Sequence, residues 1–213
     1  MTITLEQMYE MQKTLDERII REKGLEGQDL LPNTVLALQV EIGELANEWR
    51  GFKHWSNDRE PRIQVKCAKC DGFGFTYKGY AGVGWARVSS EKVMCDCSNG
   101  YRNPLLEEYV DCLHFFLSIA RQLELPADDL YIPDDFVEGE TTVIFIELLH
   151  TVARIGAEYY APKPALTQSQ RFRAALNIFF ALGEQRLGFT WEQIAAAYVE
   201  KNKVNHERQG NGY

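Results

Sequence analysis

Two short segments of this chain each carry a pair of carboxylates three residues apart. The first pair is Glu41 and Glu44, and the second pair is Glu108 and Asp111. Successive residues of a helix turn by about 100°, so side chains three apart share one face. Each pair also lies beside a stripe of apolar residues, the pattern of a helix packed into a core. If both stripes pack in one core, the four carboxylates meet at its edge.

Four carboxylates at one place repel each other unless a cation lies between them. Mg²⁺ prefers oxygen ligands, and proteins usually hold it with a few carboxylates and the phosphates of a substrate. The two pairs therefore predict a magnesium site that handles a phosphorylated ligand. The alternative is a pair of solvated helix faces, because carboxylates three apart are common on exposed helices.

The composition limits the classes of protein that fit. The chain has 213 residues, 45% of them hydrophobic, which predicts one main domain with room for a small extra module. The formal net charge of -8 argues against a chain that binds nucleic acid over its whole surface. The sequence has no long apolar run and no signal peptide, so we expect a cytoplasmic protein without a membrane segment.

Start and stop signals divide most of the chain into helices. Thr4, Thr167 and Thr190 each precede a glutamine by three residues, a capping box that predicts a helix start. Pro32 and Pro104 suit the first turns of two others. Because connections between helices dominate, the main domain is predicted to be an all-α helical bundle. The predicted helices cover about residues 5–23, 32–55, 105–123, 141–160, 167–188 and from 191 toward the end of the chain.

Residues 57–103 differ from the rest of the chain, because glycines cluster there and the helical spacing is lost. Segments 73–77 and 85–88 have the composition of strands and flank a glycine-rich turn, which predicts a small β-hairpin. We therefore divide the chain into a helical domain, 1–56 with 104–213, and an insert, 57–103.

The cysteines of the insert form two close pairs, Cys67 with Cys70 and Cys95 with Cys97. Two such pairs beside a hairpin predict a structural, zinc-ribbon-like Zn²⁺ site with four thiolate ligands. This site would supply much of the stability of a segment too short for a large core. A redox pair or a vestigial site is the alternative, because the second pair departs from Cys-x-x-Cys spacing.

Two further segments combine basic groups with aromatic rings or amides. Lys53 and Trp55 follow the first carboxylate pair, and such a mixture suits a nucleobase and its phosphates. Near the end of the chain, Lys201, Asn205 and Arg208 share one helical face. The alternatives are a packed tryptophan beside an extended lysine, and a frayed basic helix end without a ligand.

Four pieces of the sequence, in this order, resemble the dimeric dUTPase family of the all-α nucleoside triphosphate pyrophosphatase superfamily, which includes MazG-like proteins. The pieces span the chain outside the insert, and the last one favours the dUTPases over other relatives. Asp16 departs from the pattern, since some members have asparagine there. The pieces are Met11-Gln12-x-x-Leu15, Glu41-x-x-Glu44-Leu45-x-x-Glu48-Trp49-x-x-Phe52-Lys53-x-Trp55, Asp111-x-Leu113-His114-Phe115-x-Leu117-Ser118, and Lys201-Asn202-x-x-Asn205-x-x-Arg208-Gln209-x-x-x-Tyr213.

The resemblance implies hydrolysis of dUTP to dUMP and pyrophosphate by a metal-activated water, with dUDP as a further candidate substrate. It implies two or more Mg²⁺ ions at the four carboxylates, Glu41, Glu44, Glu108 and Asp111. Family members form homodimers, so a second copy of the chain is an expected partner. The implied substrate contacts come from amides, basic groups and one aromatic ring: Gln12, Lys53, Trp55, Lys201, Asn202, Asn205 and Arg208.

Two other functions remain compatible with the sequence. The first is a MazG-like pyrophosphatase for another nucleoside triphosphate, such as dCTP, because amides and aromatic rings do not fix the choice of base. The second is a nucleic-acid-binding or protein-binding module that uses the insert, which has a basic character. His114 and Cys112 lie in an apolar helix, where we interpret them as packed core residues.

Overall fold

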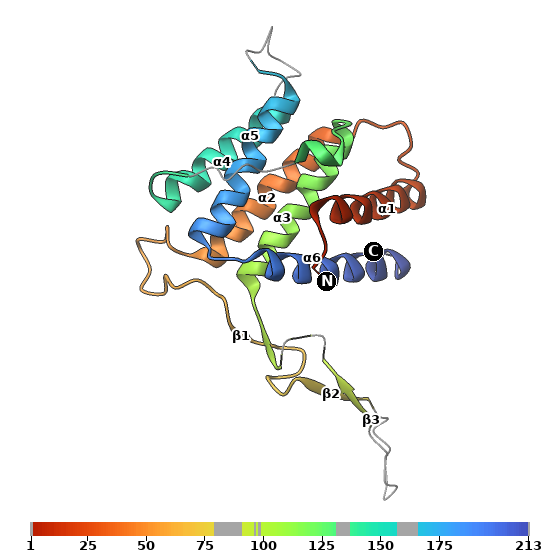
Figure 1. The fold of residues 1–213 in the computed structure, drawn as a ribbon. Helices are drawn as coiled ribbons and strands as arrows, with labels where there is room; N and C mark the ends of the chain where they lie inside the picture. The colour runs from red at the N-terminus through yellow and green to blue at the C-terminus, as the bar shows by residue number, and fades with distance from the viewer. Residues whose placement is uncertain are drawn as a thin grey trace, which may run out of the picture.

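A computed structural model describes residues 2–78, 91–95, 97, 99–130, 137–156 and 166–212. Its helices pack into one body, and a thin arm of short strands extends from one end of this body (Figure 1). The predicted all-α fold is confirmed, and none of the described helices is long and apolar enough to cross a membrane. These α-helices are α1 Leu5–Lys23, α2 Leu31–Trp49, α3 Pro104–Gln122, α4 Thr141–Gly156, α5 Gln168–Ala181 and α6 Trp191–Gly210.

Helices α2 and α3 pack against each other in the body and bury the two apolar stripes predicted from the sequence. Leu38, Ile42 and Leu45 of α2 have no exposed surface, and neither have Tyr109 and Phe116 of α3. Helix α4 packs against α2, α5 packs on α4, and α1 and α6 pack against α3 (Figure 1). Burial of large apolar side chains on both helices fixes how α2 and α3 face each other.

The predicted helix starts agree with the structure. Thr4, Thr167 and Thr190 each accept a hydrogen bond from the backbone N–H of the glutamine three residues later, and that glutamine side chain accepts one in return. Asn103 caps α3 by accepting a bond of 3.1 Å from the N–H of Leu106. These caps satisfy backbone groups that a helix otherwise leaves unpaired.

The second helix ends earlier than the sequence predicts. Helix α2 stops at Trp49 instead of near residue 55, because Arg50 takes a left-handed conformation with a φ of 64°. The buried Arg50 guanidinium donates two hydrogen bonds, of 3.0 and 2.8 Å, to the backbone oxygen of Asp58. This contact holds the chain in turns after α2, so Lys53 and Trp55 are not helical.

Two later helices also differ at their C-terminal ends. Helix α5 stops at Ala181 and continues as a π-helical turn, Leu182–Arg186, where the sequence predicts one helix to residue 188. Within this turn, a Cβ atom at Gly183 would lie 2.3 Å from the hydroxyl oxygen of the buried Tyr109. Glycine therefore permits a close approach of backbone to ring that a larger residue would block. For α4, the predicted residues 157–160 lie outside the described residues.

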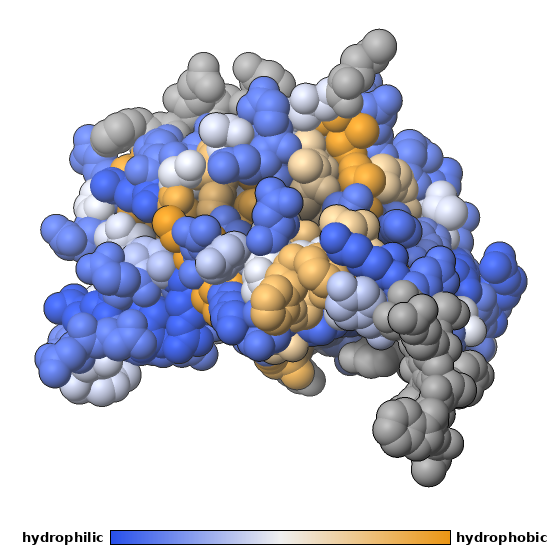
Figure 2. Space-filling model, turned by 90° about the horizontal axis from the view of Figure 1, so that it is seen from below, coloured by the Kyte–Doolittle hydropathy of each residue, from blue (hydrophilic) through white to orange (hydrophobic). Residues whose placement is uncertain are grey.

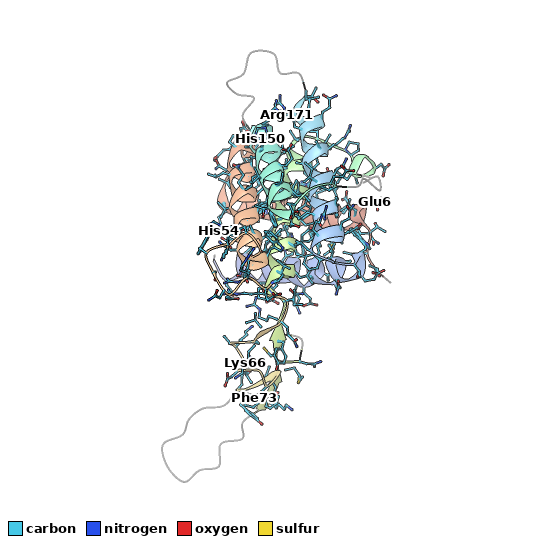
Figure 3. All side chains as sticks on the ribbon, turned by 90° about the vertical axis from the view of Figure 1, so that its left-hand side faces the viewer. Glu6, His54, Lys66, Phe73, His150 and Arg171 are labelled. Carbon is cyan, nitrogen blue, oxygen red and sulfur yellow. The ribbon has the colours of Figure 1, made fainter. Side chains whose placement is uncertain are left out.

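The arm consists of two antiparallel strand pairs. Strand β1 (Val65–Lys66) pairs with β4 (Tyr101–Arg102), and β2 (Phe75–Lys78) pairs with β3 (Glu91–Met94). The sequence places the second strand of the hairpin at 85–88, which lies outside the described residues, whereas the described partner of β2 is β3. In a side view, Lys66 and Phe73 lie on the arm, beyond the end of the helical body (Figure 3).

Both ends of the arm attach at the same place. The N–H of Arg62 donates to the backbone oxygen of Glu48 on α2 (3.0 Å), and the N–H of Leu105 on α3 donates to the backbone oxygen of Arg62 (3.1 Å). The chain therefore leaves α2, forms the arm and starts α3 beside its point of departure.

Candidate active site

Packing of α2 against α3 brings three of the four predicted carboxylates together. Glu41 of α2 and Glu108 and Asp111 of α3 each offer an oxygen atom within 4.8 Å of the other two. All three side chains are half-buried at the edge of the core. Glu44, one turn further along α2, is exposed and lies outside this group of three. Two helices far apart in the sequence thus assemble a ligand set made only of oxygen atoms.

The protonation of these groups reflects their burial and mutual repulsion. Burial, followed by the negative charges of Asp111 and Glu44, raises the pKa of both Glu41 and Glu108 to about 7. Burial also raises the pKa of Asp111, against the opposing effect of the Lys201 ammonium group. A cation among the three carboxylates would favour their charged forms, as expected of a divalent metal site.

Helix α6 adds basic groups to the carboxylates. The Lys201 ammonium group donates a hydrogen bond to Oδ2 of Asp111. The helix continues to Gly210, so Lys201, Asn205 and Arg208 lie on one helical face as predicted, and this end of the chain is helical, not frayed. Lys201 therefore joins α6 to the grouped carboxylates.

A groove adjoins the carboxylates on the side of the arm. Its volume is about 550 Å³, within the range of small-molecule sites. One wall comes from α6, with Lys201 and Arg208, and the other comes from the arm, with residues 67–69 and Tyr101–Arg102. The grouped carboxylates are not in the lining found among the described residues, but Lys201 joins them to the groove through Asp111. Seen from this end, the molecule shows hydrophilic residues around a central patch of hydrophobic ones (Figure 2).

A family model described as dUTPase matches residues 4–90 and 98–213. The chain belongs to the dUTPase family. It is therefore a hydrolase of the nucleoside triphosphate diphosphatase type, with a nucleotide as its substrate. Among curated proteins, none matches this chain. The carboxylates, Lys201 and the adjoining groove are the candidate active site of the enzyme.

A network of buried polar groups joins α1, α3 and α6. Gln12 is 3% exposed, and its amide nitrogen donates to Asp16 (2.7 Å) and to the Ser118 hydroxyl (3.0 Å). Its amide oxygen accepts from the Tyr198 hydroxyl (2.9 Å) and lies 2.7 Å from Nδ1 of His114. The amide is thus paired at both ends within the protein. The predicted contact of Gln12 with a substrate would require an exchange of partners.

Two buried polar atoms on neighbouring helices, Nε2 of His114 and Nδ2 of Asn202, have no hydrogen-bond partner among the described residues. Burial, with a smaller effect of the Lys201 charge, lowers the pKa of His114 to about 3, so the ring is neutral. Because the Gln12 oxygen is an acceptor, Nδ1 of His114 carries the proton and Nε2 keeps a lone pair. The ring stacks on Tyr198, with 4.2 Å between the ring centroids, and Asn202 follows one turn later on α6.

The sequence analysis interpreted His114 as a core residue, which describes its burial but not its hydrogen bonding. The ring is buried as expected, but the free lone pair of Nε2 was missed. The sequence did contain a signal for a polar role of this ring. His114 follows Asp111 by three residues, so both side chains lie on the same face of the helix. Cys112, by contrast, is fully buried in the core as expected.

The predicted Lys53 and Trp55 lie in the turns after α2. Trp55 is 68% exposed, with its ring edge-on to Phe52 (5.7 Å between centroids) and to His54 (4.9 Å). Figure 3 shows His54 at the edge of the helical body. Lys53 places its Nζ 5.6 Å from the centroid of the Phe52 ring. None of the described contacts joins these two residues to the carboxylates, so their role in substrate binding stays a prediction.

The four cysteines of the arm converge as metal ligands would. Their sulfur atoms all lie within 4.8 Å of one another, with 3.9 Å between Cys67 and Cys95 and 3.5 Å between Cys70 and Cys97. A tetrahedral zinc site with bonds of about 2.3 Å has sulfur–sulfur edges of about 3.8 Å, whereas a disulfide measures about 2.05 Å. The N–H of Gly74 donates to the Cys70 sulfur at 3.2 Å, which favours a thiolate. The arrangement fits a site with four thiolate ligands.

Proposed function

We propose that this dUTPase hydrolyses dUTP to dUMP and pyrophosphate, with Mg²⁺ held by Glu41, Glu108 and Asp111. The convergence of three carboxylates beside Lys201, in a chain of the dUTPase family, carries the proposal. All three groups offer the oxygen ligands that Mg²⁺ prefers. Their raised pKa values fit this role, because crowded buried acids gain from a cation that displaces their protons. Glu44, exposed one turn away, is the proposed fourth ligand.

Each group of side chains in the site has a separate proposed role in the reaction. When bound, two or more Mg²⁺ ions neutralise phosphate charge and lower the pKa of a bound water. Glu44 also accepts the proton of the attacking water, since it is the exposed carboxylate beside the group of three. Lys201 and Arg208 bind the phosphates, because both line the groove that adjoins Asp111. Asn205 adds an amide on the same helical face.

The proposed choice of base rests on Asn202 and on the neutral ring of His114. Asn202 offers a donor and His114 an acceptor, which match the C4 carbonyl and the N3–H of uracil. Both atoms are fully buried, so a base reaches them only if the side chains around them move. Cytosine has the opposite pattern on this edge, so it would leave both buried groups unpaired. Gln12 and Trp55 are further candidates for contacts to the base and the deoxyribose, Trp55 by stacking.

A second copy of the chain is the proposed partner. Leu36 and Val40 of α2 and Val143 and Ile146 of α4 are between 53% and 62% exposed. Helices α2 and α4 pack against each other, so one helix pair carries all four side chains. Exposed apolar side chains on neighbouring helices are typical of a surface that an interface buries.

The four thiolates of the arm are proposed to hold a structural Zn²⁺ ion. The sulfur distances fit tetrahedral coordination, and the described strands of the arm have no buried residue. A metal ion would therefore supply much of the stability of this module. Atomic emission on the purified protein should find about one zinc ion per chain, and a zinc-free protein with a folded arm would contradict the assignment.

A panel of nucleotides with pyrophosphate detection tests the proposed reaction. We expect pyrophosphate release from dUTP with Mg²⁺ and none after addition of EDTA, with dUDP assayed by phosphate release. Hydrolysis of dCTP with none of dUTP would replace the proposal by the MazG-like alternative. If no nucleotide is hydrolysed, but single-stranded DNA binds tightly and only with residues 57–103 present, the arm would carry the function instead.

A further inference from the structure

The Cys₄ cluster of the arm forms part of the groove beside the carboxylates. Cys67 and Cys97 line this groove together with Lys201 and Arg208 of α6. In Figure 1 the arm leaves the body at the end where α6 crosses α3, which agrees with this lining. The arm is therefore one wall of the candidate active site.

We propose that the metal-held turn of the arm, residues 67–70, binds the far end of the substrate's polyphosphate through Lys69. Lys69 lines the groove and lies between two of the clustered cysteines, Cys67 and Cys70. A metal ion that fixes both cysteines also fixes the two residues between them. The identity of the ligand as a nucleoside polyphosphate rests on the proposed function, whereas the position of Lys69 does not.

The charges of the groove favour a polyanion, because basic groups from both walls face the same space. Arg102 of the arm pairs with Glu107 of α3, with 2.9 Å between Nε and Oε1, and Lys201 pairs with Asp111. These pairs orient the cations and lower the net charge, and the thiolates of Cys67 and Cys97 add negative charge to the same lining. The groove therefore suits a polyanion through the placement of its basic groups on both walls. The lining contains four basic and two acidic residues: Lys69, Arg102, Lys201, Arg208, Glu107 and Glu200.

Backbone contacts join the turn to the segment of the arm that leads into α3. The N–H of Cys67 donates to the backbone oxygen of Gly100 (2.8 Å), and the chain runs from there through β4 into α3. A Cβ atom at Gly100 would lie 2.1 Å from the backbone oxygen of Gly72, so the two backbones are in direct contact. Lys69 is thus held within the arm by the backbone and by the cysteines on either side of it.

A purely structural role for Lys69 would have different consequences. Four thiolates around Zn²⁺ carry a net negative charge, and a nearby lysine can simply balance it. In that case the loss of Lys69 would weaken zinc binding and leave substrate affinity unchanged. A phosphate-binding role affects substrate affinity and leaves the zinc content unchanged.

Lys69→Ala tests the proposal, with Lys66→Ala as its matched control. Lys66 pairs with Asp71 at 2.7 Å and is not in the lining found among the described residues. We expect Lys69→Ala to raise KM for dUTP about tenfold, with kcat within about twofold and unchanged zinc content. Lys66→Ala should keep KM within about twofold. Equal KM values in the two variants would overturn the proposal.

The binding of inorganic pyrophosphate, measured by calorimetry with Mg²⁺ and no nucleotide, separates this proposal from the proposed function. We expect about tenfold weaker binding to Lys69→Ala than to Lys66→Ala, whichever nucleotide the enzyme hydrolyses. If dUTP is not hydrolysed but this difference is found, the proposed function fails and the subsite stands. Unchanged pyrophosphate affinity with weaker binding of single-stranded DNA would assign Lys69 to nucleic acid and overturn the proposal.

Loss of the metal should have the same effect as loss of the lysine. Cys70→Ser removes one thiolate, so we expect zinc content to fall and KM for dUTP to rise about tenfold. The turnover number should change little, because the grouped carboxylates lie on α2 and α3. A Cys70→Ser protein that loses zinc but keeps the wild-type KM would refute the coupling between the metal and the subsite.

Discussion

Glu44 and Glu108 occupy different environments, so their substitutions should differ in how strongly they weaken Mg²⁺ binding, even though Glu44 is both the proposed base and the proposed fourth ligand. Glu108→Gln removes one of the three grouped carboxylates, and we expect weaker Mg²⁺ binding and loss of turnover. Glu44→Gln removes the exposed carboxylate, and kcat should fall by about 10²–10⁴ with the fold intact. Circular dichroism, Mg²⁺ titration and pyrophosphate release measure these effects.

The control for both variants is Glu10→Gln, which removes an exposed carboxylate of α1 that pairs with Lys13. It should keep wild-type activity, because no described contact joins it to the site. Full activity in Glu108→Gln would contradict the metal site, and full activity in Glu44→Gln would contradict its role as the base.

The neutral ring of His114 should make folding sensitive to acid. Its pKa is about 3 in the folded protein and about 6.5 in an unfolded chain, so its contribution to stability is complete above pH 6.5 and is lost toward pH 3. Between pH 7 and pH 5, the free energy of unfolding should fall by about 2 kcal/mol relative to His114→Gln. Urea unfolding of both proteins at several pH values measures this difference.

The comparison with His114→Gln is needed because other groups act in the opposite direction. Glu41, Glu108 and Asp111 have raised pKa values, so they favour the folded state at low pH and lose this effect as pH rises. Both proteins carry these carboxylates, so their effect cancels in the difference. Parallel pH curves would show that His114 does not titrate as its burial implies.

At the scale of single residues, helical spacing predicted three of the carboxylates that meet, whereas Glu44, expected with them, lies outside the group. Glu41, Glu108 and Asp111 come together because each flanks an apolar stripe that is buried, and Lys201 follows from the face it occupies on α6. The pairing of Gln12 was not predictable, because its partners come from α1, α3 and α6. A local pattern identifies a polar residue on a packed face, but it does not name the groups across the interface.

At the scale of elements, the π-helical turn after α5 packs against Tyr109 of α3, the residue next to Glu108. Gly183 in this turn approaches Tyr109, which is next to Glu108 and is held by a 3.3 Å hydrogen bond to the Phe179 oxygen and by stacking on the Phe179 ring. A Cβ atom at position 183 would overlap the buried Tyr109 ring, so Gly183→Ala should destabilise the protein by about 2 kcal/mol or more. Urea unfolding measures the change.

Gly43→Ala is the matched control, since Gly43 lies within α2 and a Cβ atom there meets nothing within 4 Å. Alanine favours the helix over glycine, so this variant should gain about 0.5–1 kcal/mol. If the two variants lose stability equally, the close approach at Tyr109 is not what makes glycine necessary at position 183.

The starts of the helices were predictable and several of their ends were not. Capping boxes at Thr4, Thr167 and Thr190 are local, so the sequence alone contains them. The end of α2 depends on Arg50 and the Asp58 backbone oxygen, eight positions apart in a segment without periodic signal. The composition of 57–103 identified a β-containing insert, but the pairing of β2 with β3 spans a long connection whose length the sequence does not specify.

At the scale of the whole molecule, the exposed apolar side chains of α2 and α4 predict self-association. We expect sedimentation at twice the 24.5 kDa mass of one chain. Ile146→Glu should shift the equilibrium toward the monomer, because a charge in a buried apolar interface is unfavourable. Ile63→Glu, which changes an equally exposed residue of the arm, should leave the dimer intact. A wild-type monomer at high concentration would exclude the proposed interface.

The position of the arm beside α6 could not be predicted from the sequence. Composition separated residues 57–103 from the helices, but the wall that the arm contributes to the groove arises from contacts between distant segments. No periodic pattern links Cys67 to Lys201, so the sequence could not predict that both residues line the same groove.

The chain enters α3 beside the point where it leaves α2, and this feature of the arm should affect how quickly the protein folds. Helices α2 and α3 form a central contact, yet residues 50–103 separate them in the chain, and closing a loop costs more entropy as it lengthens. The pairing of β1 with β4 and the bond from Leu105 to Arg62 fasten this loop near its base. The loop that must then close to bring α2 and α3 together is residues 50–61, which is roughly fourfold shorter than residues 50–103. The shorter loop lowers the entropic cost of this closure by about 1 kcal/mol. An arm that forms early lets two distant helices meet almost as a short hairpin would.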